Sequence, residues 1–163
     1  MDNLEIMETM GADVRAKVNT LFPDEKNVTL LLKKVIERLG GKFIGTDEPD
    51  YCNKIDGSLH VNKSGDFVIK LPFYSSPLRD NFTVAHELGH YLIHYNGEEN
   101  VTYTRYGTDS KEIEANRFAA AFLMPKNEFL EARKELNDSV SLLAARFQVP
   151  VDIVQDRMGY ICD

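Results

Sequence analysis

Residues 86–90 read His-Glu-Leu-Gly-His, with two histidines four positions apart and a glutamate directly after the first. On an α-helix, residues four positions apart lie on the same face, about 6 Å apart along the axis, so both imidazoles can bind one metal ion. Glu87 is rotated away from the metal and can reach a nearby water molecule without ligating the metal, as a general base must. The pattern predicts metal-assisted hydrolysis, with His86 and His90 as metal ligands and Glu87 as the base.

Two histidines are one ligand short, because a catalytic zinc ion usually has three protein ligands and one open position. His94 lies about 12 Å along the helix from His86, too far to share one ion, so we expect it to pack or to support a ligand. The extended HExxHxxGxxH pattern fails, since the chain has Ile93 and Asn96 where that pattern needs Gly and His. His60 has no ligand spacing, and we expect it to be structural or to line a pocket wall.

The third ligand is expected from a second predicted helix over residues 110–124, which carries Glu112 and Glu114. These two positions are 200° apart on a helix, so only one of them can face the metal. Glu114 has Lys111 and Arg117 three positions away on either side, which is typical of a solvated charge. We therefore predict Glu112 as the third metal ligand, with Glu114 as the alternative.

The helix face that Glu112 occupies supports this assignment. Its small residues would let the second helix approach the HExxH helix closely, and the face consists of Glu112, Ala115, Asn116, Ala119 and Leu123. Asn116 lies one turn beyond Glu112 and could hydrogen-bond a ligand imidazole from behind. A simpler reading of Glu112 is a helix-start carboxylate, because Asp109-x-x-Glu112 resembles a capping box. That reading alone does not explain the Ala and Asn residues on the same face.

The surrounding sequence predicts the elements that must position these residues. Apolar spacing and turn signals predict helices over 3–20 and 28–39, followed by short strands over 42–45, 58–62 and 66–71. Asn62-Lys63-Ser64-Gly65 predicts a hairpin turn between the last two strands. Ser75-Ser76-Pro77 predicts the start of the HExxH helix, which we expect to end at His94. We expect a polar loop over 97–110 and, after the second metal helix, short helices over 127–136, 139–147 and 151–158.

Composition limits the class of protein. The chain has 163 residues, 43% of them hydrophobic and 28% charged, which predicts a folded chain with its own core. Its formal charge of −7 argues against non-specific nucleic-acid binding, which depends on neutralising phosphates. Cys52 and Cys162 are too few for a disulfide framework. With no signal-peptide pattern and no long apolar stretch, we expect a cytoplasmic protein that does not span a membrane.

The segments HELGHYLIH and EIEANRFAAAFLMP together closely resemble the ImmA/IrrE family of zinc metallopeptidases, over residues 78–125. The resemblance implies an α+β, zincin-like fold, in which a small twisted antiparallel or mixed sheet packs with the HExxH helix and a second ligand-bearing helix. It implies a gluzincin-like site with Zn²⁺ as cofactor, held by His86, His90 and Glu112, with Glu87 as catalytic base. Asn116 stands where gluzincins have the aspartate of their ExxxD pair.

The resemblance also implies a function. Several family members are cytoplasmic bacterial or phage-related proteins that cleave helix-turn-helix repressors, so we expect a zinc metalloendopeptidase whose partner is such a repressor. We expect residues 1–125 to form the metallopeptidase domain and residues 126–163 to form a helical tail, helix-turn-helix-like, packed on the same domain. The alternative is a regulatory binding module without catalysis, in which zinc is structural or vestigial. Intact Glu87 argues against that alternative.

Three further expectations concern substrate and partner. Direct DNA binding by the tail is disfavoured, because its residues 139–158 have only Arg146 and Arg157 as positive charges. The strand over 66–71 precedes the metal helix, and we expect it to be an edge that pairs with an extended substrate. An oxyanion donor is also expected, and the sequence does not choose among its nearby tyrosines, Tyr74, Tyr91, Tyr103 and Tyr106.

Overall fold

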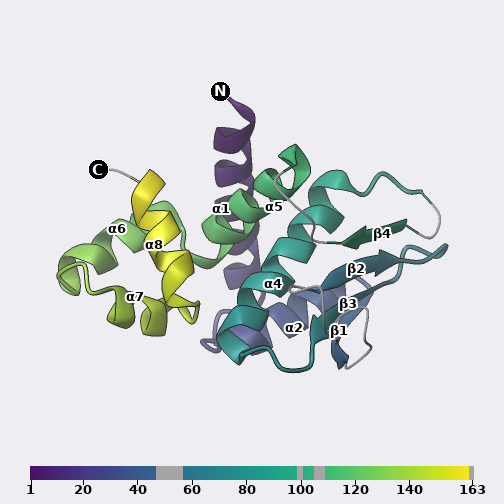
Figure 1. Cartoon of the computed structure of the whole chain (residues 1–163), viewed down its shortest axis with the longest axis horizontal. Helices are drawn as coiled ribbons and strands as arrows, with labels where there is room; N and C mark the ends of the chain where they lie inside the picture. Colours follow the sequence, from purple (N-terminus) through teal and green to yellow (C-terminus); the bar gives the residue numbers. More distant parts are fainter. Residues whose placement is uncertain (47–56, 99–100, 105–108, 162–163) are drawn as a thin grey trace.

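The computed structural model describes residues 1–46, 57–98, 101–104 and 109–161 of the chain. Helices and a small sheet are combined in a mixed α+β fold, with the sheet at one end and the C-terminal helices at the other (Figure 1). The expected fold class is confirmed. The elements are α1 (Asn3–Leu21), α2 (Val28–Arg38), β1 (Gly41–Thr46), β2 (Ser58–Val61), β3 (Phe67–Pro72), α4 (Pro77–Gly89), η1 (His90–His94), β4 (Val101–Thr104), α5 (Ser110–Leu123), α6 (Lys126–Glu135), α7 (Val140–Phe147) and α8 (Val151–Tyr160).

The sheet has the strand order β1-β3-β2-β4. Strand β1 runs parallel to β3, whereas β2 is antiparallel to both β3 and β4. A tight turn joins β2 to β3, in which the Asn62 N–H donates to the Asp66 carbonyl at 2.9 Å. Gly65 in this turn has a φ of 89°, a conformation that favours glycine. The hairpin expected from the Asn-Lys-Ser-Gly sequence is therefore present.

Two expectations about the sheet were wrong. Strand β3 is paired on both sides, so residues 66–71 do not form the edge that an extended substrate could join. Residues 97–110 were expected to be a loop, but this segment contains β4, which pairs with β2. The four residues of β4 are too short for an alternating pattern to stand out, and it is pairing with β2 that makes them a strand.

Helix α4 starts as the sequence predicts. The Ser76 hydroxyl accepts from the Arg79 N–H at 3.2 Å, and Pro77 occupies the first turn. Residues 81–89 are all buried, because α4 packs against α2, β3 and α5. The helix continues to His94 as expected, but its last turn is a π-helix, closed by the Tyr95 N–H donating to the His90 carbonyl at 3.0 Å.

Helix α5 lies between α1 and α4 (Figure 1). A glycine on each of these two neighbours permits the close approach. A Cβ added at Gly89 of α4 would lie 3.0 Å from the Phe118 ring and 3.4 Å from the Ala115 backbone. A Cβ added at Gly11 of α1 would lie 2.5 Å from the Phe118 carbonyl oxygen. The Gly89 contact lets α5 approach α4 and so positions the predicted metal ligands, and the Gly11 contact brings α1 close to α5.

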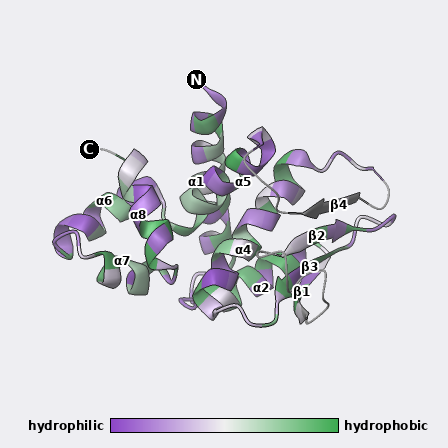
Figure 2. Ribbon diagram, viewed as in Figure 1, coloured by the Kyte–Doolittle hydropathy of each residue, from purple (hydrophilic) through white to green (hydrophobic). Residues whose placement is uncertain are grey.

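The C-terminal helices pack on the same hydrophobic core as the rest of the chain. Phe129, Leu143 and Val154 belong to one buried cluster with Leu88 and Phe118. Helices α6–α8 carry both hydrophilic and hydrophobic residues (Figure 2), as expected of helices with one buried face. None of the described helices combines the length and the apolar composition needed to cross a membrane.

Arg157 of α8 is fully buried and ties this tail to the other end of the chain. Its guanidinium makes a two-pronged contact with the Glu8 carboxylate of α1, at 2.6 and 2.7 Å. It also donates to the Met124 carbonyl, at the end of α5, at 2.7 Å. Arg157, one of the two arginines counted as positive charges of the tail, is therefore buried in an ion pair and not exposed at the surface.

Arg157→Met should lower the free energy of unfolding by about 3 kcal/mol, because it leaves the mostly buried Glu8 carboxylate and the Met124 carbonyl without their partner. Urea denaturation followed by circular dichroism measures this loss. Arg146→Met is the matched control, since Arg146 pairs with Glu135 on the surface, where a salt bridge is worth less than about 1 kcal/mol. Equal losses in the two variants would contradict this role for Arg157.

Candidate metal centre

Helices α4 and α5 bring His86, His90 and Glu112 together in the interior. The Nε2 atoms of the two histidines lie 3.1 Å apart. His86 Nε2 lies 3.0 Å from Glu112 Oε2, and His90 Nε2 lies 2.8 Å from Glu112 Oε1. All three residues are buried, and among the described residues they form the one group of histidines, cysteines and acids with metal-ligand spacing.

The start of α5 aims Glu112 at the histidines. Asp109 caps the helix, with its Oδ1 accepting from the Glu112 N–H at 2.9 Å. The capping-box reading of Glu112 therefore describes only its backbone, because the Glu112 carboxylate faces the two imidazoles of α4. Glu112 is thus placed by its own cap, one turn before Ala115, whose backbone lies against Gly89 of α4.

The Glu112 carboxylate is an anion at neutral pH. Burial raises the pKa of this group. Hydrogen bonds from His86 and His90, together with the electrostatic attraction between their rings and the carboxylate, outweigh burial and lower the pKa to about 2. A carboxylate binds a metal in its ionised form. These hydrogen bonds come from Nε2 of the same two rings, so a metal ion shared by the three groups would displace those protons.

The chemistry of the three groups fits a metal ion. Asn116 Oδ1 lies 2.8 Å from His86 Nδ1, and because an amide oxygen only accepts, this ring nitrogen donates its proton to it. The Nε2 of His86 is left to face a second nitrogen and a carboxylate, which repel one another unless a proton or a cation lies between them. Tetrahedral zinc places its ligand atoms roughly 3.4 Å apart, so each side of this triangle needs to open by roughly 0.3–0.6 Å to hold the ion.

His94 lies behind the triangle, as its distance along the helix predicts. Its Nδ1 lies 2.8 Å from His90 Nδ1, and its Nε2 lies 2.8 Å from Glu114 Oε2. Burial lowers the pKa of His94, although its hydrogen bond to Glu114 opposes this. The interpretation of Glu114 as a solvated charge was wrong, because its side chain is only 18% exposed and also accepts from Asn3 of α1 at 3.4 Å.

Glu87 is fully buried on α4, directly after His86. His60 fulfils the structural expectation, since its Nδ1 lies 2.7 Å from the Thr102 hydroxyl and joins β2 to β4.

Among the tyrosines considered as oxyanion donors, Tyr74 is 62% exposed, and the Tyr91 hydroxyl donates to the Gly65 carbonyl at 3.4 Å. The Tyr103 side chain and all of Tyr106 lie outside the described part of the structure.

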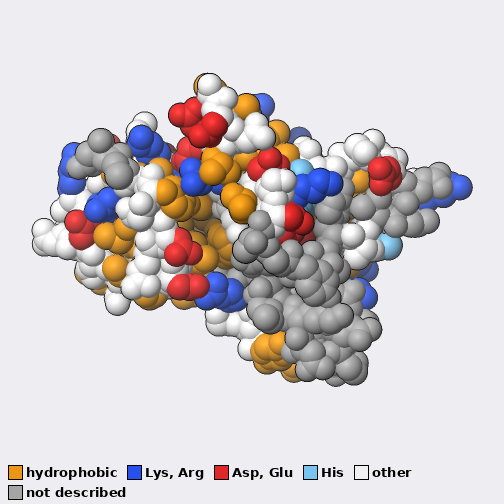
Figure 3. All heavy atoms as spheres, turned by 45° about the horizontal axis from the view of Figure 1, so that its top comes forward, with side chains coloured by type: hydrophobic (Ala, Val, Ile, Leu, Met, Phe, Trp, Pro, Cys, Tyr) orange, Lys and Arg blue, Asp and Glu red, His pale blue; other side chains and the backbone are white. Residues whose placement is uncertain are grey.

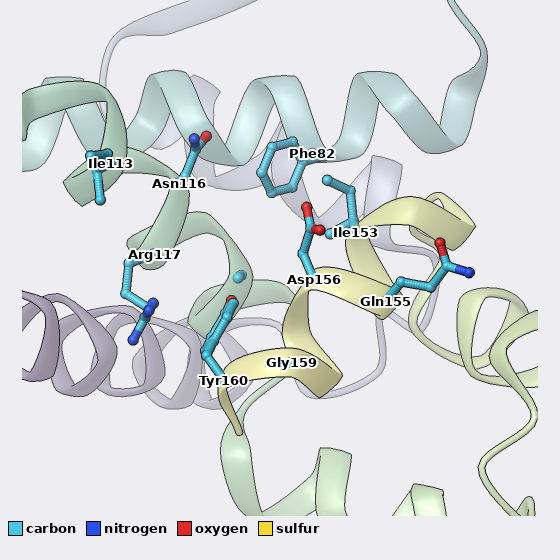
Figure 4. Close-up of a pocket in the computed structure, with 10 residues that line it drawn as sticks. Phe82, Ile113, Asn116, Arg117, Ile153, Gln155, Asp156, Gly159 and Tyr160 are labelled. Carbon is cyan, nitrogen blue, oxygen red and sulfur yellow. The ribbon is translucent and has the colours of Figure 1, made fainter. Parts of the chain in front are cut away.

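A cavity of about 490 Å³ adjoins the metal centre behind Asn116, between α4, α5 and α8. Figure 4 shows Asn116 and Phe82 at one side of this cavity and Asp156 and Tyr160 of α8 at the other. The Arg117 guanidinium lies 3.9 Å from the centre of the Tyr160 ring. Sequence reasoning missed this cavity, because nothing in the spacing of residues shows that α8 folds back onto α5.

Two features of the chain agree with known proteins. The sequence profile of the IrrE N-terminal-like domain family (Peptidase M78) matches residues 52–158. The fold is similar to that of a Mycobacterium tuberculosis transcriptional regulator, with a TM-score of 0.60 and 19% sequence identity, over 98% of this chain and 52% of the regulator. The chain thus spans about half the length of that regulator, and at this identity the likeness shows the fold alone.

A comparison with curated proteins finds no sequence match. The family match covers more than half of the 163 residues and includes both metal helices. The chain therefore belongs to the IrrE N-terminal-like domain family.

Proposed function

We propose that this protein is a zinc-dependent metalloendopeptidase. The observation that carries the proposal is the buried triangle of His86, His90 and Glu112, with Glu87 next to the first ligand on the same helix. The family profile, which is that of a peptidase family, supports it. Two imidazoles and one carboxylate form a ligand set that zinc peptidases use, with a further position for water or substrate.

His86, His90 and Glu112 would hold the zinc ion. When bound there, zinc would act as a Lewis acid that polarises the scissile carbonyl and makes water more acidic. Asn116 would orient the His86 ring from behind, since its amide oxygen already accepts from the outer nitrogen of that ring. Close packing of α4 on α5 would hold all three ligands in place without the substrate.

Glu87 would serve as the general base. Its carboxylate would accept a proton from the attacking water and then deliver it to the leaving amine, so that one group performs both transfers. Its position directly after His86 keeps it on the metal helix but off the ligand face. Full burial excludes bulk solvent from competing for that proton.

A helix-turn-helix repressor is the substrate that we propose, on the basis of the family resemblance. The mycobacterial protein that shares the fold is named a transcriptional regulator, which is compatible with this. Lys and Arg side chains are scattered among acidic ones on the face shown in Figure 3, with no continuous basic patch among the described residues there. A net charge of −7 suits a partner with a basic DNA-binding face. The two proteins would meet in the cytoplasm.

An extended substrate segment would have to pair at another strand than β3. Within the described part of the sheet, β1 and β4 form the two edges.

The alternative function is a regulatory binding module that docks on its partner without cleaving it. The two functions differ in whether the Glu87 carboxylate is needed.

Purified protein should contain about one zinc per chain, as expected of a single three-ligand site. Alanine at His86, His90 or Glu112 should weaken zinc binding by more than the roughly 10–100-fold that loss of a supporting partner costs. Metal analysis after dialysis measures this, with His60→Ala as the histidine control that keeps its zinc. If Glu114→Ala strips the metal and Glu112→Ala does not, the assignment of Glu112 is wrong.

Glu87→Gln should keep the zinc but lower peptide hydrolysis by about 100-fold or more, because a neutral amide cannot accept the proton from water. Cleavage of the partner and zinc content are measured on the same sample. The exposed Glu37, which pairs with Lys33 on α2, provides the control Glu37→Gln with unchanged activity. If the Glu87→Gln variant still regulates its partner in full, the protein acts as a docking module and not by proteolysis.

The enzyme should cleave its repressor much faster than it digests an unfolded protein such as casein. The expected reason is docking, in which the acidic chain is steered to a basic partner, so association should also slow as salt rises. Stopped-flow association and gel-based cleavage at several salt concentrations measure both effects. Casein digestion as rapid as repressor cleavage would instead indicate a general peptidase.

A further inference from the structure

Behind the metal triangle, three side chains form a continuous line of hydrogen bonds that leads away from His90. His90 Nδ1 lies 2.8 Å from His94 Nδ1, and His94 Nε2 lies 2.8 Å from Glu114 Oε2. The line is largely desolvated, with the His94 side chain 6% exposed and that of Glu114 18% exposed. It joins the last turn of the metal helix to the second metal helix.

The chemistry of the two ends sets the direction of every hydrogen bond in this line. A histidine that faces the metal with Nε2 carries its proton on Nδ1, so His90 donates to His94 Nδ1. The Glu114 carboxylate only accepts, so His94 donates to it from Nε2. Both requirements select the same tautomer of His94, which accepts at Nδ1 and donates at Nε2.

We propose that Glu114 is a positioning residue for the metal centre and acts on His90 through His94. This inference rests on the proposed metal site. The carboxylate fixes the tautomer of His94, and His94 in turn fixes the orientation and tautomer of the ligand ring. An anion at the end of the line also makes His90 a more basic ligand than a neutral partner would.

The local structure is built around this line. The chain leaves the regular helix at His90 and forms a π turn that ends at His94, a deviation that is frequent at functional sites. The rings of His90 and His94 lie 4.9 Å apart, centre to centre. Asn3, the first residue of α1, donates to the other oxygen of Glu114 at 3.4 Å, which holds the carboxylate in position.

The two histidine ligands are therefore supported in different ways. His86 donates to the neutral amide of Asn116, and His90 is supported by an anion through a second ring. His90 should be the ligand whose strength depends on a charge outside the site. Supporting groups of this kind typically change metal affinity 10–100-fold.

The first test measures the affinity of the full-length protein for Zn²⁺ by competition with a chromophoric chelator. Glu114→Gln keeps the size of the side chain and an acceptor oxygen for His94 but removes the charge. We expect it to weaken zinc binding about 10-fold, whereas the surface control Glu135→Gln should match the wild type. Affinity of Glu114→Gln within twofold of the wild type would overturn the proposal.

A double-mutant cycle tests whether Glu114 acts through His94. His94→Leu should itself weaken zinc binding, and adding Glu114→Gln to it should have no further effect, because the line is already cut. Effects that multiply would show that the carboxylate acts directly through space, which contradicts the proposal. Circular dichroism of each variant checks that the fold is retained.

Nitrogen-15 correlation spectra of the zinc-loaded wild type give a second measurement that needs no variant. His94 should be found as the Nε2–H tautomer, and detection of its Nδ1–H tautomer would overturn the proposal. The zinc titration separates this inference from the function on which it rests. If the wild type binds no zinc, the metal site itself is refuted. If the wild type and Glu114→Gln bind zinc with equal affinity, only the relay from Glu114 through His94 to His90 is refuted.

Discussion

The close approach of α4 and α5 is the constraint on which the site depends. Gly89 lets the Ala115 backbone and the Phe118 ring come within contact distance of the HExxH helix. That separation is what allows a carboxylate at the start of α5 to meet two imidazoles on α4. A Cβ at position 89 would lie only 3.0 Å from the Phe118 ring and 3.4 Å from the Ala115 backbone, so α5 would have to adjust at the point where it meets the HExxH helix.

Elements distant in sequence serve this helix pair. Helix α1 packs on the far side of α5 through Gly11, and its first residue contacts Glu114, so the N-terminal helix supports both the packing and the proposed relay. The C-terminal tail is held to α1 and α5 by Arg157. The candidate metal centre is thus supported by parts of the chain that lie on both sides of α4 and α5 in sequence.

Local patterns predicted much of this structure, and contacts between distant segments account for the rest. The Ser76-Pro77 start, the Asn62–Gly65 turn and the spacing of the histidines are short-range signals that a sequence states directly. Strand β4 and the interior place of β3 depend on which strands pair, and pairing is not encoded in four or six residues. Glu114 was misjudged because its helical neighbours, Lys111 and Arg117, are visible in the sequence, whereas its partner His94 lies on another helix.

X-ray absorption at the zinc edge identifies the ligands of the proposed site, because it reports the atoms bound to the metal and not the activity of the protein. We expect two imidazole nitrogens and one carboxylate oxygen at about 2.0–2.2 Å from the zinc, with no sulfur among the ligands. Sulfur at about 2.3 Å would instead place the metal on a cysteine thiolate. That result would contradict a site formed by His86, His90 and Glu112.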